Sequence, residues 1–422
     1  MSLGRYVLAS STAMHWIALG DQLPGARLLC SPDYGGDFLA RNRDVLADCD
    51  GLVAVFFDGS IEALLDQMGV PICFPPSSVR AALEDKCEAV RLAQAAGVPV
   101  APTCLAKITG YVQLRSLAEA ASLGQALVVQ LPKGNSGKGT FAIRRESDYA
   151  AVADRLEAAG DCRIMQELPS PQSYCIETVL TDAGPVIGLP ALDLVGIPEL
   201  TPNPDGWCGN VIGAGVVHPT LASQMRANSL RVAGAVQQLH PDFFGYSGDD
   251  YLLPANSQQL VYQEKNARCT GMIPLSNLAA HELGVPPLLL QPLLQFQGGG
   301  ASIDVDGLNR RWSGGDGVGV SSCLIIKQLG SGPAFLRHWP RPGLYALDSG
   351  SVRCLSHSID ALPLLSLPGR ALWIPETPGG TLQPQDILGR LLVRGRVTDG
   401  NALNGPGHAW IAALRAAFVY GD

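Results

Sequence analysis

The feature that most constrains the fold of this chain is a glycine-rich turn between two short apolar runs. The runs at residues 126–130 and 141–143 are predicted β-strands, and the turn between them includes Gly134, Gly137 and Gly139. Because glycine has no side chain, backbone N–H groups in such a turn can approach a phosphate closely. An ordinary glycine-rich hairpin is the alternative, since glycines are common in turns.

The same turn carries two lysines that can bring positive charge to a phosphate. We expect Lys138, and with it Lys133, to contact a nucleotide in this turn. The segment has neither the G-x-x-x-x-G-K-[ST] spacing of P-loop proteins nor the G-x-G-x-x-G of dinucleotide-binding folds. The pattern therefore predicts a phosphate-gripping hairpin and disfavours those two nucleotide-binding folds.

A second informative segment contains two predicted strands, at residues 250–253 and 259–263, joined by a turn. On a strand, side chains repeat every second residue, so Glu264, Asn266 and Arg268 share one face. An acidic residue from the paired strand, best Asp250, would complete a hard oxygen site for Mg²⁺. A charged strand face that simply contacts solvent is the alternative.

Apolar periodicity predicts a protein of mixed α/β and α+β class in three parts. Residues 1–77 alternate short buried strands with helices, which indicates an α/β lobe with a parallel sheet. Residues 78–300 form a central domain with a small lid at about 104–165, and residues 301–422 are predicted to be mostly β.

Three local predictions bear on the site. Residues 78–96 have the spacing of one long helix that ends at Gly97. Residues 198–219 are rich in Pro, Gly and Asn and are predicted to be a long loop near the site. Ser60 is the predicted N-cap of a helix that runs to Met68.

In order along residues 78–271, these segments resemble the motifs of the ATP-grasp superfamily. The stretches LEDK at 83–86 and AGVPVAPT at 96–103 are similar to the family's DK helix and the AGVPVPPT that ends it. The glycine-rich hairpin is similar to its flexible loop, and IMQEL at 164–168 to its hinge strand. Asp250 followed by Glu264-x-Asn266-x-Arg268 matches the family's D…ExNxR signature.

The resemblance implies an ATP-grasp fold, with an N-terminal parallel-sheet lobe, a small lid subdomain and a mostly β C-terminal domain. It implies that Asp250, Glu264 and Asn266 hold Mg²⁺, with Mn²⁺ as an alternative, and that Arg268 and Lys138 are catalytic. The ATP-binding residues that it implies are Lys133, Gly137, Lys138, Gly139, Gln166, Glu167 and Leu168.

The chain departs from the family pattern at Gln130, where a Lys is usual. That nucleotide contact is therefore missing or has moved to Lys133. Gln166 also replaces the commoner hinge Glu, and Gln172 or Ser173 stands where a ribose-binding Glu is frequent.

These residues predict an ATP-dependent carbon–nitrogen ligase. ATP and Mg²⁺ would activate a carboxylate as an acyl phosphate, an amine would capture it to form an amide or peptide bond, and ADP and phosphate would be released. A biotin-carboxylase-like enzyme that uses bicarbonate as the carboxylate is one alternative. A non-catalytic nucleotide-binding regulatory module is another.

Composition bears on partners and compartment. Asp and Glu outnumber Lys and Arg by 38 to 30, so no overall positive field favours nucleic acid. The 11 cysteines include no C-x-x-C pair, and no apolar run approaches the length of a membrane span. We expect a cytoplasmic protein with small-molecule carboxylate and amine substrates, no nucleic-acid or membrane partner, and leave a homodimer open.

Overall fold

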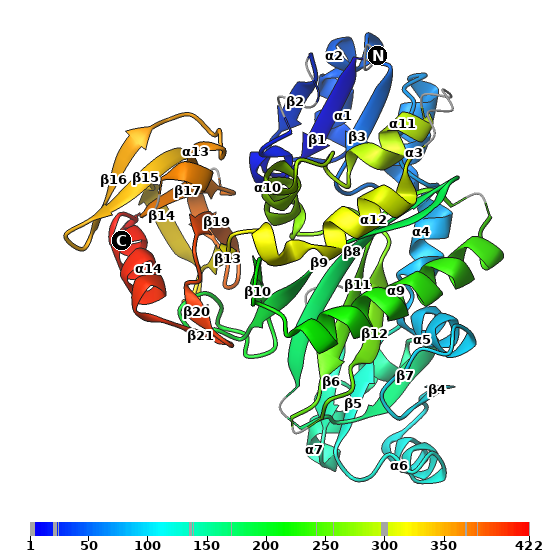
Figure 1. The fold of residues 1–422 in the computed structure, drawn as a ribbon. Coiled ribbons are helices and arrows are strands. Elements are labelled where there is room, and N and C mark those ends of the chain that lie inside the picture. The colour runs from blue at the N-terminus through cyan, green and yellow to red at the C-terminus, as the bar shows by residue number, and fades with distance from the viewer. Residues whose placement is uncertain are drawn as a thin grey trace.

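The structure is a computed structural model, and its N-terminal part is a small parallel α/β lobe (Figure 1). Strand β1 (Tyr6–Ser10) lies between β2 (Arg27–Cys30) and β3 (Gly51–Ala54), and both neighbours run parallel to it. The residues that the structure describes are 5–19, 23, 25–134, 137, 139–169, 171–241, 243–255, 257–296, 303–367, 369–377 and 379–421.

The helices of this lobe pack around the three strands. They are η1 (Ala13–Trp16), α1 (Gly36–Arg41), α2 (Arg43–Ala47) and α3 (Gly59–Gln67). Asp58 caps α3, because its carboxylate accepts from the backbone N–H groups of Ser60 and Ile61, each at 3.0 Å. The prediction of Ser60 as the cap was therefore wrong: the carboxylate two residues earlier reaches the free N–H groups first.

A four-stranded antiparallel sheet, in the region predicted to be the lid, lies at the bottom of Figure 1. Its strand order is β4 (Thr103–Lys107), β7 (Asp161–Gln166), β5 (Leu127–Gln130) and β6 (Thr140–Ile143). Helices α6 (Tyr111–Ala120), α7 (Glu146–Ala150) and α8 (Ala153–Glu157) pack on it around a separate apolar core. The glycine-rich turn joins β5 to β6, as the sequence predicts.

A ten-stranded sheet, counted over the described residues, connects the centre of the molecule to its C-terminal part. It continues without a break from the predicted metal-binding strands into the C-terminal strands (Figure 1). Its order is β12 (Val261–Asn266), β11 (Gly245–Leu253), β8 (Gln172–Thr181), β9 (Gly184–Val195), β10 (Trp207–Ile212), β13 (Ser321–Lys327), β19 (Ile387–Arg394), β17 (Arg370–Pro375), β15 (Gly343–Asp348) and β16 (Ser351–Ser356).

Two smaller sheets and a terminal helix complete the C-terminal part. The order of the first is β18 (Gly380–Leu382), β14 (Ala334–His338) and β22 (Val419–Gly421), and the second pairs β20 (Thr398–Asp399) with β21 (Ala402–Leu403). The helices here are η2 (Gly315–Gly317), α13 (Pro363–Ser366) and α14 (Gly405–Ala416).

Helices cover the two faces of the large sheet differently. On one face, α9 (Pro219–Leu239) and α5 (Lys86–Ala95) share an apolar core with the sheet. On the other, the N-terminal lobe packs with α10 (Ile273–Leu283), α11 (Leu290–Phe296) and α12 (Val305–Ser313). The predicted site lies on this second face, where three parts of the chain meet.

Two further predictions were wrong in detail. Residues 78–96 form two helices, α4 (Ser77–Leu83) and α5, because the Asp85 carboxylate accepts from Cys87 N and Glu88 N and starts a new helix. The segment 198–219 is not loop throughout, since it contains strand β10. Both exceptions bring polar groups toward the site.

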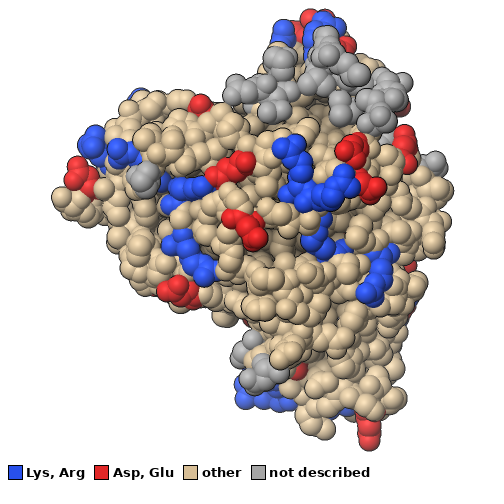
Figure 2. All heavy atoms as spheres, in the orientation of Figure 1, with Lys and Arg blue, Asp and Glu red and all other residues tan. Residues whose placement is uncertain are grey.

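On the face drawn in Figure 2, Lys and Arg side chains stand among Asp and Glu side chains, with wide uncharged areas between them. Within the described ranges, no helix has the length and apolarity needed to cross a bilayer.

Candidate active site

The hairpin of β11 and β12 brings the residues of the D…ExNxR pattern together. Asp250 pairs with Glu264 in the register, and Gly248 pairs with Asn266. Asn266 Nδ2 donates to Asp250 Oδ2 at 2.8 Å, and Arg268 Nη1 donates to Asn266 Oδ1 at 2.6 Å. The four residues therefore form one cluster on one face of the sheet, as their alternation in the sequence predicts.

Two residues from the break between α4 and α5 complete this cluster. Lys86 Nζ forms a short ion pair with Glu264 Oε2, and Arg268 Nη1 lies 3.3 Å from Glu84 Oε1. The backbone N–H of Lys86 also donates to the carbonyl of Pro132 at 2.9 Å. The N-terminus of α5 thus connects the acidic cluster to the glycine-rich turn.

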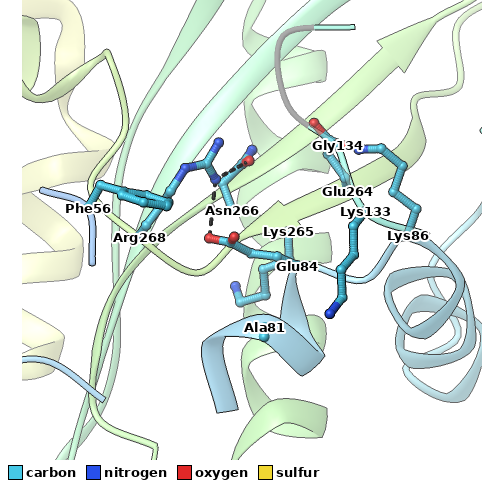
Figure 3. A pocket seen from close by; sticks show the side chains of 10 residues that line it. All are labelled: Phe56, Ala81, Glu84, Lys86, Lys133, Gly134, Glu264, Lys265, Asn266 and Arg268. Atoms are coloured by element: carbon cyan, nitrogen blue, oxygen red, sulfur yellow. Dashed lines mark hydrogen bonds and ion pairs between the residues drawn. The ribbon is translucent and has the colours of Figure 1, made fainter. Parts of the chain in front are cut away.

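A cavity of about 230 Å³ opens between these elements (Figure 3). Lys133 and Gly134 line it from the turn, and Phe56 lines it from the N-terminal lobe. All the residues that line it are Phe56, Ala81, Glu84, Lys86, Lys133, Gly134, Glu264, Lys265, Asn266 and Arg268. Three parts of the chain therefore enclose one charged cavity.

Burial and neighbouring charges shift the pKa values of the two acidic residues of the site, Asp250 and Glu264. Burial, and then the nearby carboxylates of Asp193 and Glu264, raise the pKa of Asp250 well above its usual range. Burial also opposes ionisation of Glu264, but the Lys86 ammonium and then Arg268 hold its pKa below the ordinary value. Glu264 is thus kept charged by the protein, whereas Asp250 lacks a full cationic partner of its own.

The donor set fits a hard divalent cation. Asp250, Glu264 and Asn266 offer carboxylate and amide oxygens within one hydrogen-bonded cluster. Among the described residues, no group of three or more His, Cys, Asp or Glu side chains is placed to hold a metal. Mg²⁺ commonly binds through one or two carboxylates and takes its other ligands from phosphates and water, so two carboxylates and an amide suffice.

Two further predicted nucleotide residues, Gly137 and Gly139, belong to the glycine-rich turn between β5 and β6. Gly137 has φ +77°, and a Cβ there would lie 3.3 Å from the carbonyl oxygen of Asp205; a Cβ at Gly139 would lie 3.2 Å from that of Lys133. The positive φ therefore favours glycine at position 137, and a side chain at position 139 would crowd the Lys133 carbonyl. Lys138, predicted as catalytic, lies outside the described residues.

The predicted hinge begins within β7, whose last residue is Gln166, and it lies outside the cavity lining described above. Gln166 N donates to Pro102 O, and Glu167 N donates to Ala126 O, each at 3.0 Å. The Glu167 carboxylate pairs with Arg144 from the lid, whose Nε lies 2.8 Å from Oε2. Leu168 follows them, half-buried.

Arg163 was missed by the sequence reasoning. It is fully buried on β7 directly opposite Gln130, and its Nη1 donates to Gln263 O at 2.7 Å and to Gln130 Oε1 at 3.4 Å. Its Nε and Nη2 have no hydrogen-bond partner within the described ranges. Burial lowers the pKa of Arg163 to about 10. A lone Arg in the apolar run CRIM was the available signal.

A polar row extends from Asp250 across the same face. Cys175 lies opposite Asp250, and Asp193 on β9 accepts from Ser173 Oγ at 2.8 Å and from Asn210 Nδ2 at 2.6 Å. Burial is the main cause that raises the pKa of Asp193. These polar side chains therefore satisfy one another's hydrogen bonds on a covered face of the sheet.

Comparisons with known proteins address the fold. No model of a known protein family matches the sequence, and no curated protein matches it. The biotin carboxylase domain of Hydrogenobacter thermophilus 2-oxoglutarate carboxylase, solved with MgADP and bicarbonate, superposes with a TM-score of 0.64 at 13% identity. The match covers 100% of this chain and 91% of that one.

Two further solved structures are similar. N5-carboxyaminoimidazole synthase from Aspergillus clavatus, solved with ADP and a ribonucleotide, gives a TM-score of 0.61 at 13% identity over 94% of this chain and 95% of that one. Biotin carboxylase from Campylobacter jejuni gives 0.63 at 11% identity over 99% and 92%. The predicted fold class is confirmed: the chain has the ATP-grasp fold.

Proposed function

We propose that this protein is an ATP- and Mg²⁺-dependent ligase that activates a carboxylate as an acyl phosphate and transfers the acyl group to an amine. The observation that carries the proposal is the cluster of Asp250, Asn266 and Arg268, with Glu264 held by Lys86, at the edge of a cavity closed by the glycine-rich turn. The similar folds solved with ADP support the choice of nucleotide.

The reaction requires positive charge because two anions must meet. At about 4 Å, two unit charges repel by roughly 4 kcal/mol at an effective dielectric near 20. Lys86, Lys133 and Arg268 line the cavity where this repulsion must be offset. Held by Asp250, Glu264 and Asn266, Mg²⁺ would neutralise phosphate charge there. Arg163 would supply the positive charge that the Gln130 position lacks.

Arg268 has the best position to contact the transferred phosphate. Its Nη1 contacts Asn266 and Glu84, so the guanidinium is fixed beside the oxygen ligands before any substrate binds. A donor that is already oriented needs no reorganisation as charge develops, which is the main source of rate in phosphoryl transfer.

A carboxylase is the second candidate, because one similar structure was solved with bicarbonate. The two functions differ in which acid stimulates ADP release. The test measures ADP release with amino acids and dipeptides, offered as acid and amine, and separately with bicarbonate and biotin, and identifies products by mass spectrometry.

We expect ADP release that requires both an organic acid and an amine, together with a product containing an amide bond. Glu264→Gln should lower this rate by roughly 10²-fold or more, because it removes a charge that holds the metal. ADP release with bicarbonate alone would favour the carboxylase. Full turnover by the Glu264→Gln variant would contradict the site assignment.

A further inference from the structure

Glu177 on β8 is a buried carboxyl group to which the proposed reaction assigns no role. Its side chain is almost completely buried, at 1% exposure. Oε1 accepts a hydrogen bond from Thr270 Oγ1 at 2.8 Å, and Oε2 has no hydrogen-bond partner in the part of the chain that the structure describes. The Ser276 hydroxyl, which lowers the pKa of Glu177, donates its hydrogen bond to Ile273 O at 3.2 Å. A buried carboxyl oxygen left without a partner is costly, so it indicates a position where a ligand supplies one.

The sheet register places Glu177 beside the metal site. Glu177 pairs with Gly248 on β11, and Gly248 pairs with Asn266 on β12, so the three share one face of the sheet. With about 3.3 Å per residue and about 4.8 Å between strands, the backbone of Glu177 lies roughly 8 Å from that of Asp250. A small substrate can span that separation.

Gly248 makes room for the contact between Glu177 and Thr270. A Cβ at Gly248 would lie 2.7 Å from Thr270 Cγ2, so the Thr270 side chain occupies the space that a larger residue would fill. Thr270 is two residues beyond Arg268 in the sequence. Glu177 is therefore hydrogen-bonded to the segment that carries the phosphate-binding arginine.

The surroundings of Glu177 suit proton transfer near neutral pH. Burial raises the pKa of Glu177 to about 7, and the Ser276 and Thr270 hydroxyls act in the opposite direction. The titratable groups that face it are the thiols of Cys175 and Cys269. An acceptor with a pKa near the working pH is the effective kind of general base.

We infer that Glu177 is the catalytic base that removes the proton from the attacking amine. This inference rests on the proposed ligase function. An ammonium substrate transfers one proton to the Glu177 carboxylate, and the freed lone pair forms the C–N bond. The bond between carbonyl carbon and phosphate oxygen breaks, and phosphate leaves with that electron pair and takes the second proton of the nitrogen. Glu177 then returns its own proton to solvent.

The test compares two nucleophiles in the same enzyme. Hydroxylamine is largely uncharged at neutral pH and traps an acyl phosphate as a hydroxamate without needing a base. An aliphatic amine is protonated and needs one. We therefore expect Glu177→Gln to keep hydroxamate formation near the wild-type rate and to lose amide formation by roughly 10²-fold or more. Glu177→Asp should restore part of the amide rate.

Thr270→Val is the matched control, because it removes the hydrogen bond to Glu177 and keeps the carboxyl. If Glu177 only positions the Arg268 segment, Glu177→Gln and Thr270→Val should lower both products equally, which would overturn the inference. Equal rates of both products in Glu177→Gln and wild type would overturn it as well. If the wild-type protein forms no hydroxamate, the acyl phosphate itself is wrong and the ligase proposal fails first.

Binding of a fluorescent ATP analogue to each variant keeps the test interpretable. We expect Glu177→Gln to bind the analogue as tightly as the wild type, because Glu177 lies outside the described lining of the nucleotide cavity. A variant that fails to bind has lost its fold, and the comparison then passes to Glu177→Asp. Its shorter carboxylate should lower amide formation more than hydroxamate formation, and equal rates or equal losses of the two products would contradict the base.

Discussion

The two faces of the β11–β12 hairpin carry neighbouring charged residues that are used in opposite ways. On the face toward α9, Asp249 and Lys265 form an ion pair at 3.0 Å with both side chains fully buried. Tyr262 Oη donates to the same Asp249 oxygen at 3.1 Å, and Thr178 Oγ1 donates to the other at 3.0 Å. On the face toward the N-terminal lobe, Asp250 instead lies near two further carboxylates, those of Glu264 and Asp193.

The difference shows how a structural carboxylate differs from a ligand. Asp249 receives donors on both oxygens from its own protein, so nothing further is needed to keep it buried. Asp250 receives one donor, from Asn266, and its neighbours Asp193 and Glu264 add like charge. A cluster of this kind is completed by a cation from outside, which is why we place the metal on this face.

The largest expected effect comes from replacing the two adjacent aspartates by asparagine, one in each of two variants. Asp249→Asn should lower the free energy of unfolding by about 3–5 kcal/mol, because Lys265 is left buried without its partner. Asp250→Asn should change it by about 1 kcal/mol or less, yet lower ADP release by roughly 10²-fold or more, because a metal ligand is lost. Urea unfolding and ADP release are measured on both variants.

An Asp249→Asn/Lys265→Met double variant is the control, since it removes both members of the pair. It should recover much of the stability lost in Asp249→Asn, because no unpaired charge remains. If Asp249→Asn were as stable as the wild type, or if Asp250→Asn retained full turnover, the two faces would not differ as described.

The alternation of residues in the sequence predicted which side chains share one face of this hairpin. It did not predict which residues from other parts of the chain contact them. The repeat of two along a strand placed Glu264, Asn266 and Arg268 on one face. The register confirms this for Glu264 and Asn266, and the hydrogen bond from Arg268 to Asn266 places Arg268 beside them. The choice of Asp250 over Asp249 agrees with the register, in which Asp250 lies opposite Glu264. Lys86, however, contacts Glu264 across 178 positions of sequence, and no local pattern encodes such a distant contact.

Other residues of the site depended on tertiary structure. Glu177 looks like any charged residue within the run YCIETVL, and only burial and the unpartnered oxygen distinguish it. Arg163 contacts Gln130 from a strand that lies beside it in the sheet, 33 positions away in the sequence. The helix break at Asp85 is local, but apolar periodicity continues through it and hides it.

On the face toward the N-terminal lobe, ionisation of Glu177 should make the stability of the protein depend on pH. The ordinary pKa of a glutamate is 4.5, and that of Glu177 in the folded protein is about 7. Between these values the folded chain holds a proton that the unfolded chain releases, so this group makes stability fall as pH rises. The difference of about 2.5 between the two pKa values changes the free energy of unfolding by roughly 3 kcal/mol at most.

Glu177→Gln has no such group, so the variant should gain stability relative to the wild type as pH rises from 4.5 to about 7. The measurement is the difference in thermal unfolding midpoint between the two proteins across that range, which cancels the other titrating groups. A constant difference would show that Glu177 ionises normally, and would weaken its contrast with the paired Asp249.

The smallest expected effect comes from replacing one threonine on each face, Thr178 and Thr270, by valine. Thr178 follows Glu177 in the sequence but points to the opposite face, where its hydroxyl donates to Asp249. Thr178→Val keeps the shape and removes one hydrogen bond to a charged acceptor, so unfolding should become easier by about 1–2 kcal/mol while turnover stays unchanged. Thr270→Val, on the other face, removes the donor to Glu177 and should alter turnover. If instead Thr178→Val slowed catalysis as much as Thr270→Val, the face toward α9 would take part in the reaction, and the division between a structural and a reactive face would be wrong.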